Sequence, residues 1–401
     1  MTEVGSRIYL DHHATTPVDQ RVFEEMEPYF QELYGNPSNS DDYQFANQAK
    51  RAVEGARKRI GRSFNTHRPG DIVFTSGATE ADNLALRGVV RHVESNGRDA
   101  HFITGATEHD AIRGTARQLS ASGFDWTEIE PDEYGRIRPE TVQDAIREDT
   151  VLVSVMAANN EIGTTAELEA IGKIAREEEV LFHTDAVQAV GYQELDVQKL
   201  GIDLMSISGH KIYGPKGVGA LYVRRRNPQV RSRIQPQLTG GGQEGQIRSG
   251  TLNVPSIVGL GKAVELAVTE MDERTEHAMR LRDALWSELE ERLADVTLNG
   301  HATERLPNNL NVSFLGITNK GLVTNLSEHD PEIVTAAGAA CSTSGARTET
   351  SHVLRNITED TDRRRSAIRF GVGKGNSMAE IEYAADVIVE EVERLRTKFS
   401  F

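Results

Sequence analysis

Short apolar runs alternate with longer amphipathic stretches between about residues 72 and 223. The run at 72–75 reads as a strand, and residues 78–94 follow it with apolar side chains at helical spacing. Further strand-like runs occur at 101–104, 151–156, 180–184, 204–208 and 220–223. This alternation predicts an α/β fold built around a mostly parallel sheet.

The pattern changes after about residue 230. A glycine-rich loop is expected at 231–250, and residues 254–293 read as long helical material with an inter-domain helix near 261–270. From residue 309 onward shorter elements are mixed, namely strands at 310–314 and 367–370 and a helix at 378–395. We therefore expect a second, smaller α+β domain toward the C-terminus.

The composition is that of an ordinary globular enzyme. The 401 residues are enough for two packed domains, and 38% of them are hydrophobic and 26% charged. No apolar run is long enough to span a membrane and the first ten residues lack a secretory signal pattern, so a cytoplasmic location is expected. The single cysteine, Cys341, excludes an intramolecular disulfide and fits a reducing compartment.

Most of the predicted strands end in a polar cluster. These clusters are Thr75-Ser76-Gly77, Glu108-His109, Asn159-Asn160-Glu161, Asp185 and Ser208 to Lys211. In an open α/β sheet, ligands collect at the carboxyl ends of the strands. The five clusters are therefore expected to share one crevice.

The strongest local motif is the stretch from Ser206 to Gly217, which contains Lys211 at the end of a strand among small and hydroxylic residues. Desolvation lowers the pKa of an amine, which makes such a lysine suited to forming a Schiff base. Lys216 is the nearest competitor, but it lies within Gly-Pro-Lys-Gly, a tight turn that favours exposure. Taken alone, the segment fits a surface loop with two solvated lysines equally well.

Three further residues or segments have both a functional and a structural interpretation. Residues 75–80 could form a phosphate-binding helix N-terminus or a simple helix cap. Asp185 could pair with a pyridinium nitrogen or cap a helix, and His109 could stack on a ring, shuttle protons or be an ordinary half-buried histidine. Each structural interpretation is the more common one in isolation. The occurrence of all these groups at separate strand ends favours a site.

Motifs along almost the whole chain resemble those of the cysteine desulfurases of the NifS/IscS type. These are class-V aminotransferase enzymes of fold type I that use pyridoxal 5'-phosphate (PLP). The resemblance rests on Ile8-Tyr9-Leu10-Asp11, Ala14-Thr15-Thr16-Pro17, Gly35-Asn36-Pro37-Ser38, Ser76 to Glu80, Asn159 to Gly163, Ser208 to Gly217, Arg248-Ser249-Gly250-Thr251 and Ile368-Arg369-Phe370.

The resemblance implies a PLP-dependent transferase fold, with a seven-stranded type of sheet in a large domain at 17–262. The small α+β domain would combine residues 1–16 with 263–401 and carry a catalytic cysteine loop at about 335–350. A homodimer is also implied, because Thr251 would reach the cofactor phosphate of the partner subunit.

The resemblance also implies a role for each site residue. Lys211 would hold PLP as a Schiff base, Asp185 would pair with the pyridine nitrogen, Gln188 would bind the ring hydroxyl, and His109 would stack on the ring and assist catalysis. The phosphate would be held by Thr79, Ser208, His210 and the backbone of Gly77 and Ala78. Asn160 and Arg369 would bind the substrate carboxylate, with Asn160 also contributing to the cofactor pocket.

Cys341 lies in a run of small residues, 335–345, which favours a mobile loop. Its position matches the catalytic cysteine of the family, whose thiolate attacks the sulfur of L-cysteine and becomes a persulfide while alanine leaves. Relatives commonly carry Ser-Ser-Gly-Ser-Ala-Cys here, whereas this chain has Ala336-Ala337-Gly338-Ala339-Ala340-Cys341. The loop keeps its size but loses hydroxyl groups.

Other functions remain open at this stage. A selenocysteine lyase, a cysteine-sulfinate desulfinase or a non-catalytic sulfur-relay scaffold would share much of the pattern. The sulfur acceptor protein is also open, because iron–sulfur assembly, tRNA thiolation and DNA phosphorothioation all use such enzymes. His12-His13 beside Asp11 could suggest metal ligation, but adjacent histidines point apart on a strand, so no metal site is expected.

The net charge of −16 leads to two expectations. A dispersed acidic surface repels phosphates, which argues against direct and general binding of DNA or RNA. Because arginine also far outnumbers lysine, the surface suits a salt-rich solvent.

We expect the thermal unfolding midpoint to depend on KCl up to molar concentration. An unfolding midpoint that does not change with salt in calorimetry would contradict this.

Overall fold

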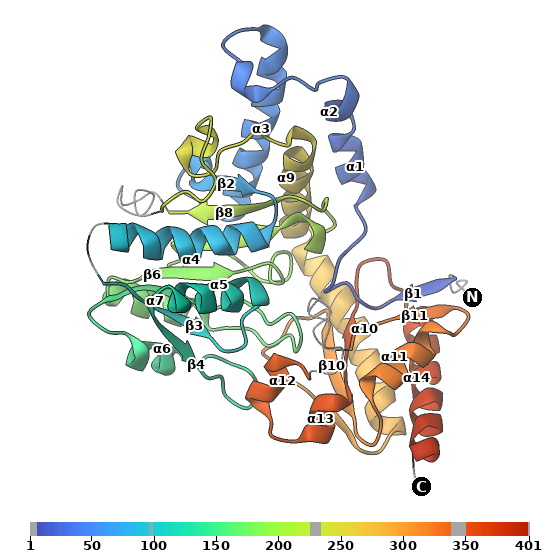
Figure 1. Cartoon of the computed structure of the whole chain (residues 1–401). Coiled ribbons are helices and arrows are strands. Elements are labelled where there is room, and N and C mark those ends of the chain that lie inside the picture. Colours follow the sequence, from blue (N-terminus) through green and yellow to red (C-terminus); the bar gives the residue numbers. More distant parts are fainter. Residues whose placement is uncertain (1–5, 96, 98, 225–233, 338–349, 400–401) are drawn as a thin grey trace.

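The computed structural model describes residues 6–95, 97, 99–224, 234–337 and 350–399 (Figure 1). Its largest sheet has seven strands, as the family resemblance implied, and they are arranged in the order β2-β8-β7-β6-β5-β3-β4. Only β8 runs antiparallel to its neighbours, and every other pair is parallel. The strands are β2 (Ile72–Thr75), β3 (His101–Gly105), β4 (Asp125–Ile129), β5 (Thr150–Ser154), β6 (Leu181–Asp185), β7 (Leu204–Ser208) and β8 (Gly219–Val223).

Both faces of this sheet are covered by helices, which explains the uninterrupted apolar runs in its strands. Successive residues of a strand point to opposite faces, so Phe102 packs in one core and Ile103 in the other. Helices on the Phe102 side are α4 (Ala78–Ser95) and α5 (Asp110–Ala121). Helices on the Ile103 side include α3 (Gln44–Ser63), α7 (Leu168–Glu177) and α9 (Val254–Thr269).

The predicted strands of this sheet are confirmed to within two residues at each end. Strand β4 was not predicted, because Asp-Trp-Thr-Glu-Ile contains no continuous apolar run. It lies at the edge of the sheet and its residues are mostly part-exposed. The helical stretch predicted at 254–293 is broken at Glu270, where α9 ends and α10 (Met271–Arg292) begins.

A second, smaller core lies between α10 and α14 (Met378–Phe399). It includes an antiparallel sheet of β9 (Val296–Leu298), β10 (Asn309–Phe314) and β12 (Ala367–Gly371). At its side the N-terminal strand β1 (Arg7–Tyr9) pairs in parallel with β11 (Glu332–Val334), as Figure 1 shows. Residues from both ends of the chain therefore build this part of the molecule.

The remaining α-helices are short. They are α1 (Gln20–Met26), α2 (Pro28–Gln31), α6 (Pro139–Ala145), α11 (Asn319–Ser327), α12 (His352–Ile357) and α13 (Thr361–Arg365). Among the described residues, none of the helices has the length and apolar character needed to cross a bilayer.

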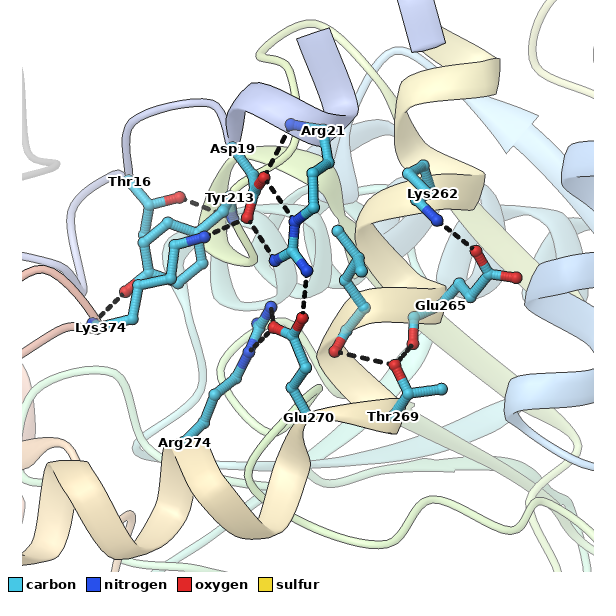
Figure 2. A network of polar contacts seen from close by, with 11 residues as sticks. Thr16, Asp19, Arg21, Tyr213, Lys262, Glu265, Thr269, Glu270, Arg274 and Lys374 are labelled. Atoms are coloured by element: carbon cyan, nitrogen blue, oxygen red, sulfur yellow. Dashed lines mark hydrogen bonds and ion pairs between the residues drawn. The ribbon is translucent and has the colours of Figure 1, made fainter. Parts of the chain in front are cut away.

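A network of polar contacts joins the two parts of the molecule (Figure 2). The Asp19 carboxylate accepts hydrogen bonds from Arg21 and pairs with Lys374, which follows β12. Arg21 in turn contacts Glu270, at the break between α9 and α10, and Arg274 contacts the same carboxylate. The side chain of Asp19 is only 6% exposed, so its charge depends on these cationic partners.

We predict that Asp19→Asn lowers the free energy of unfolding by about 1–2 kcal/mol, because the Arg21 and Lys374 charges lose a shared and largely buried partner. Arg7→Met is the matched control, since Arg7 pairs with Glu332 at an exposed position and should change stability by less than about 1 kcal/mol. Denaturant unfolding of both variants measures the difference. Equal decreases in the free energy of unfolding for the two variants would contradict the conclusion that the Asp19 network stabilises the protein more than the Arg7–Glu332 pair does.

Candidate active site

Lys211 lies directly after strand β7, in a single 3-10 turn over Gly209–Lys211. Glycine is required at position 209 because a Cβ atom there would lie 2.7 Å from the carbonyl oxygen of Pro215. The Lys211 amine points toward the N-terminal segment, where Nζ donates hydrogen bonds to the backbone oxygens of His13 and Ala14. The predicted cofactor lysine is thus held by two carbonyl groups that precede it by almost 200 residues.

Tyr213 keeps the Lys211 turn in place. It has a left-handed φ of 65°, a conformation that costs a non-glycine residue about 1–3 kcal/mol and persists only where its surroundings enforce it. Its N–H donates to Thr16 Oγ1 at 2.8 Å, its carbonyl accepts from the Asp19 N–H, and its hydroxyl accepts from the Lys374 N–H at 2.8 Å. The backbone near Lys211 is therefore fixed by contacts with both the N-terminal segment and the smaller part of the molecule (Figure 2).

A cavity of about 490 Å³ opens at the carboxyl ends of the strands, in front of Lys211. This volume lies in the range of small-molecule sites. The structure brings most of the predicted site residues to its wall. They are Gly77, Ala78, Thr79, His109, Asn160, Asp185, Gln188, Ser208, His210, Lys211 and Arg369.

Two predicted site residues are not in this group. Thr251 is exposed and does not line the cavity of its own chain. Cys341 lies outside the described residues. Lys216, the competing lysine, is exposed but reaches the edge of the same cavity.

One end of the cavity is formed by the N-terminus of α4. The first N–H groups of a helix have no partner within it and carry the positive end of its dipole, which suits an anion. A Cβ atom built on Gly77 would meet no atom within 4 Å, so there is open space at this helix end. Glu80 receives the Ser76 N–H at 2.7 Å and pairs with Arg248, which keeps its carboxylate engaged.

Asp185 ends strand β6 at the wall of the cavity. Its Oδ1 accepts the Val187 N–H at 2.9 Å. Burial raises the pKa of this carboxyl above its ordinary value, while His109 and Lys211 act in the opposite direction. A cationic group placed beside Asp185 would therefore stabilise its ionised form.

His109 has two roles that the sequence could not separate. It is the N-cap of α5, and its Nδ1 accepts the Ala111 N–H at 3.1 Å. An acceptor at Nδ1 places the proton of a neutral ring on Nε2. The same residue lines the cavity, so the capping and ligand-binding interpretations are compatible.

Behind Asp185 lies a buried polar cluster that the sequence analysis missed. The His183 ring contacts the hydroxyls of Ser154 and Ser206, and its Nε2 lies 3.7 Å from Asp82 Oδ1. Burial lowers the pKa of His183 to about 3 and raises that of Asp82 well above its ordinary value. The His183 ring is therefore neutral near pH 7, and burial favours the neutral form of Asp82 as well.

Arg369 on β12 forms the opposite end of the cavity and is 3% exposed. Its Nη1 donates to the Asn160 carbonyl at 2.8 Å, and its Nη2 pairs with Asp11 Oδ1 at 2.6 Å. Its Nε is buried without a hydrogen-bond partner among the described residues. Asp11 thus balances the buried charge, while the guanidinium keeps donors for a further carboxylate.

Residues on both sides of the cysteine segment lie next to this end of the cavity. Ala336 pairs with Arg369 through two backbone hydrogen bonds, and Thr335 Oγ1 donates to the Arg369 carbonyl at 2.6 Å. On the other side, Ser351 donates to the buried Glu161 carboxylate and His352 lines the cavity.

Sequence reasoning missed His13, Asp82 and His352 as cavity residues, and it placed Glu161 in the crevice without giving it a role. The signal for His13 was its position directly before the Ala14-Thr15-Thr16-Pro17 motif. Glu161 lies within a motif that was attributed to Asn160. Asp82 and His352 carry no local signal, because only the packing of α4 and α12 brings them to the site.

Comparisons with known proteins place this geometry in a family. The model of the aminotransferase class-V family matches residues 8–383. The chain is 45% identical to the cysteine desulfurase IscS of Anaeromyxobacter dehalogenans strain 2CP-C over 97% of its length and 93% of that protein.

Two solved structures are also similar to the chain. A NifS-like protein has a TM-score of 0.87 and 36% identity, covering 97% of this chain and 100% of that one. The structure of SspA in complex with cysteine has a TM-score of 0.77 and 35% identity, covering 91% and 98% of the two chains. The chain therefore belongs to the class-V aminotransferase family, and within it to the cysteine desulfurases of the NifS/IscS type.

Proposed function

We propose that the chain is a PLP-dependent cysteine desulfurase that converts L-cysteine to L-alanine and transfers the sulfur to Cys341 as a persulfide. One observation carries the proposal, namely that the Lys211 amine, the Asp185 carboxylate and the Arg369 guanidinium line the same cavity. Similarity to proteins named cysteine desulfurase, and to a structure solved with cysteine, supports the substrate.

The residues of the cavity fit PLP. Burial raises the pKa of the Asp185 carboxyl, so the pyridine nitrogen would supply a cation that stabilises its ionised form, and the open space at Gly77 would accept the phosphate. Lys211 would bind the aldehyde, Gln188 the ring hydroxyl and His109 the ring face. Thr79, Ser208 and His210 would complete the phosphate site. When bound, this cofactor withdraws electrons from the α-carbon of an attached amino acid.

The side chains of this protein would then orient and move the substrate atoms. Arg369 and Asn160 would hold the carboxylate of cysteine, which fixes the amino acid in the cavity. The Lys211 amine would move protons to and from the substrate carbon. Its two carbonyl partners, His13 and Ala14, hold it at the cavity wall.

The Cys341 thiolate would attack the substrate sulfur. A sulfur–sulfur bond forms, the carbon–sulfur bond breaks, and its electron pair stays on the carbon, which takes up a proton to give alanine. The described residues on both sides of the segment, Ala336 and His352, lie beside Arg369 and the cavity, which supports this role.

We further propose a homodimer in which Thr251 reaches the phosphate site of the partner subunit. Its exposed position, away from the cavity of its own chain, supports this arrangement. The domains would be 17–262 and the combination of 1–16 with 263–401. The persulfide would pass to a sulfur-acceptor protein.

Lys211→Ala is predicted to abolish the yellow colour of the purified protein, because no other amine would occupy the cofactor position. The same substitution is predicted to lower the activity about a thousandfold or more. Visible absorption and alanine production measure the two effects. Lys216→Ala is the matched control and should keep the colour. Colour that depends on Lys216 and not on Lys211 would overturn the assignment, and a colourless wild-type protein that ignores added PLP would overturn the function.

Cys341→Ala is predicted to keep the colour and to abolish sulfur transfer, because the cofactor pocket remains while the persulfide carrier is lost. Mass spectrometry of the cysteine-treated protein should show one added sulfur on the wild type and none on the variant. An added sulfur that persists in the variant would exclude Cys341 as the acceptor.

A further inference from the structure

His12 and His13 are the motif that the proposed function leaves unexplained. The structure directs their side chains to different places. The ring of His12 packs edge-on against Tyr9 with centroids 4.9 Å apart, whereas the ring of His13 is completely buried between Gln188 and Asn308. No cluster of histidine, cysteine and carboxylate side chains suited to a metal ion occurs in the described part of the chain.

His13 contacts both ends of the Gln188 amide. Its Nδ1 lies 2.9 Å from Gln188 Oε1, and its backbone oxygen accepts a hydrogen bond from Gln188 Nε2 at 3.1 Å. The other ring nitrogen, Nε2, lies 3.2 Å from the carbonyl oxygen of Asn308. Gln188 lines the same cavity as Lys211, so these contacts with His13 hold a side chain of the proposed cofactor site.

The surroundings determine where the His13 ring carries its proton. Both ring nitrogens face oxygen atoms, but burial lowers the pKa of His13 to about 3, and the nearby Arg369 and Lys211 charges act in the same direction. The ring is therefore neutral near pH 7 and has one proton to donate.

The proton belongs on Nδ1. Gln188 Oε1 lies 2.9 Å from Nδ1, a shorter contact than the 3.2 Å between Nε2 and the Asn308 oxygen, and that oxygen also has the Val372 N–H as a donor. With Nδ1–H donated to Oε1, and one Nε2 proton of Gln188 donated to the His13 carbonyl, the orientation of the amide is fixed. Its second N–H is then left for an acceptor in the cavity.

The same carbonyl also receives the Lys211 amine. A single residue of the N-terminal segment thus contacts the proposed Schiff-base lysine and the proposed ligand of the ring hydroxyl.

We propose that His13 is a positioning residue that orients Gln188 so that its free amide N–H points at the ring hydroxyl of the cofactor. This inference rests on the proposed PLP site. It goes beyond it by assigning the orientation of the Gln188 amide to the side chain of His13, in the N-terminal segment.

Two polar substitutions distinguish the two sides of the ring. His13→Asn keeps an amide near the position of Nδ1, and His13→Gln keeps one near the position of Nε2. They are compared with Gln188→Met, which keeps the shape but removes the donor, and with the double variant His13→Gln/Gln188→Met. The PLP-loaded proteins are studied before cysteine is added, by pH titration of visible absorption, by the rate of cofactor loss on dilution and by the thermal unfolding midpoint.

We expect His13→Gln to shift the absorption titration in the same direction as Gln188→Met, and to speed cofactor loss by about three- to tenfold, the effect of one lost hydrogen bond. The double variant should be no worse than Gln188→Met, because both substitutions remove the same contact. His13→Asn should stay close to the wild type.

The proposal is overturned if His13→Gln lowers the unfolding midpoint but changes neither the absorption titration nor the rate of cofactor loss. It is also overturned if the effects of His13→Gln and Gln188→Met on cofactor loss add in full in the double variant. Equal behaviour of the Asn and Gln variants would also overturn it, because Nδ1 would then have no special role. These readouts need no turnover. A wild type that binds PLP but ignores cysteine would overturn the proposed activity while leaving the test of His13 intact.

Discussion

The site depends on the way in which residues 11–19 lie between the two parts of the molecule. Asp11 pairs with Arg369, Thr16 accepts the N–H of Tyr213, and Asp19 pairs with Lys374. Between them, the carbonyls of His13 and Ala14 receive the Lys211 amine. A segment that has almost no regular secondary structure therefore sets the distance between the proposed cofactor lysine and the arginine on β12.

This arrangement is held in place because its charges are hard to move. Taking Arg369 or Asp19 from its partner would leave a charge in a poorly solvated place, which costs several kcal/mol per ion at full burial. The conformation of Tyr213 is stabilised by the same segment, through Thr16 and Asp19. The polar contacts thus contribute to the uniqueness of the structure as well as to its stability.

In and behind the cavity, burial raises the pKa of acids and lowers the pKa of bases. It favours the neutral forms of Asp185, His183 and His13. Lys211 and His109 counteract it at Asp185, which is the group that would face a cationic ring.

Local pattern predicted six of the seven strands of the sheet and the polar clusters at their ends, whereas Gln188 and Arg369 were assigned to the site only through the family resemblance. A parallel sheet with both faces covered requires apolar runs, and it collects its strand ends at one edge, so the runs located Lys211, Asp185 and His109 together. The edge strand β4 escaped prediction because half of its residues face away from the cores. The break at Glu270 also escaped, because no glycine or proline marks it.

Only the tertiary structure decided how the N-terminal segment contributes. The sequence placed His13 beside a recognised motif, but its contacts with Gln188 and Asn308 span about 175 and 295 residues, and no local rule predicts them. The same holds for Asp11 with Arg369 and for Asp82 behind Asp185. Residue type and spacing indicate which chemical groups can gather at strand ends. The positions of their supporting partners depend on how distant segments pack.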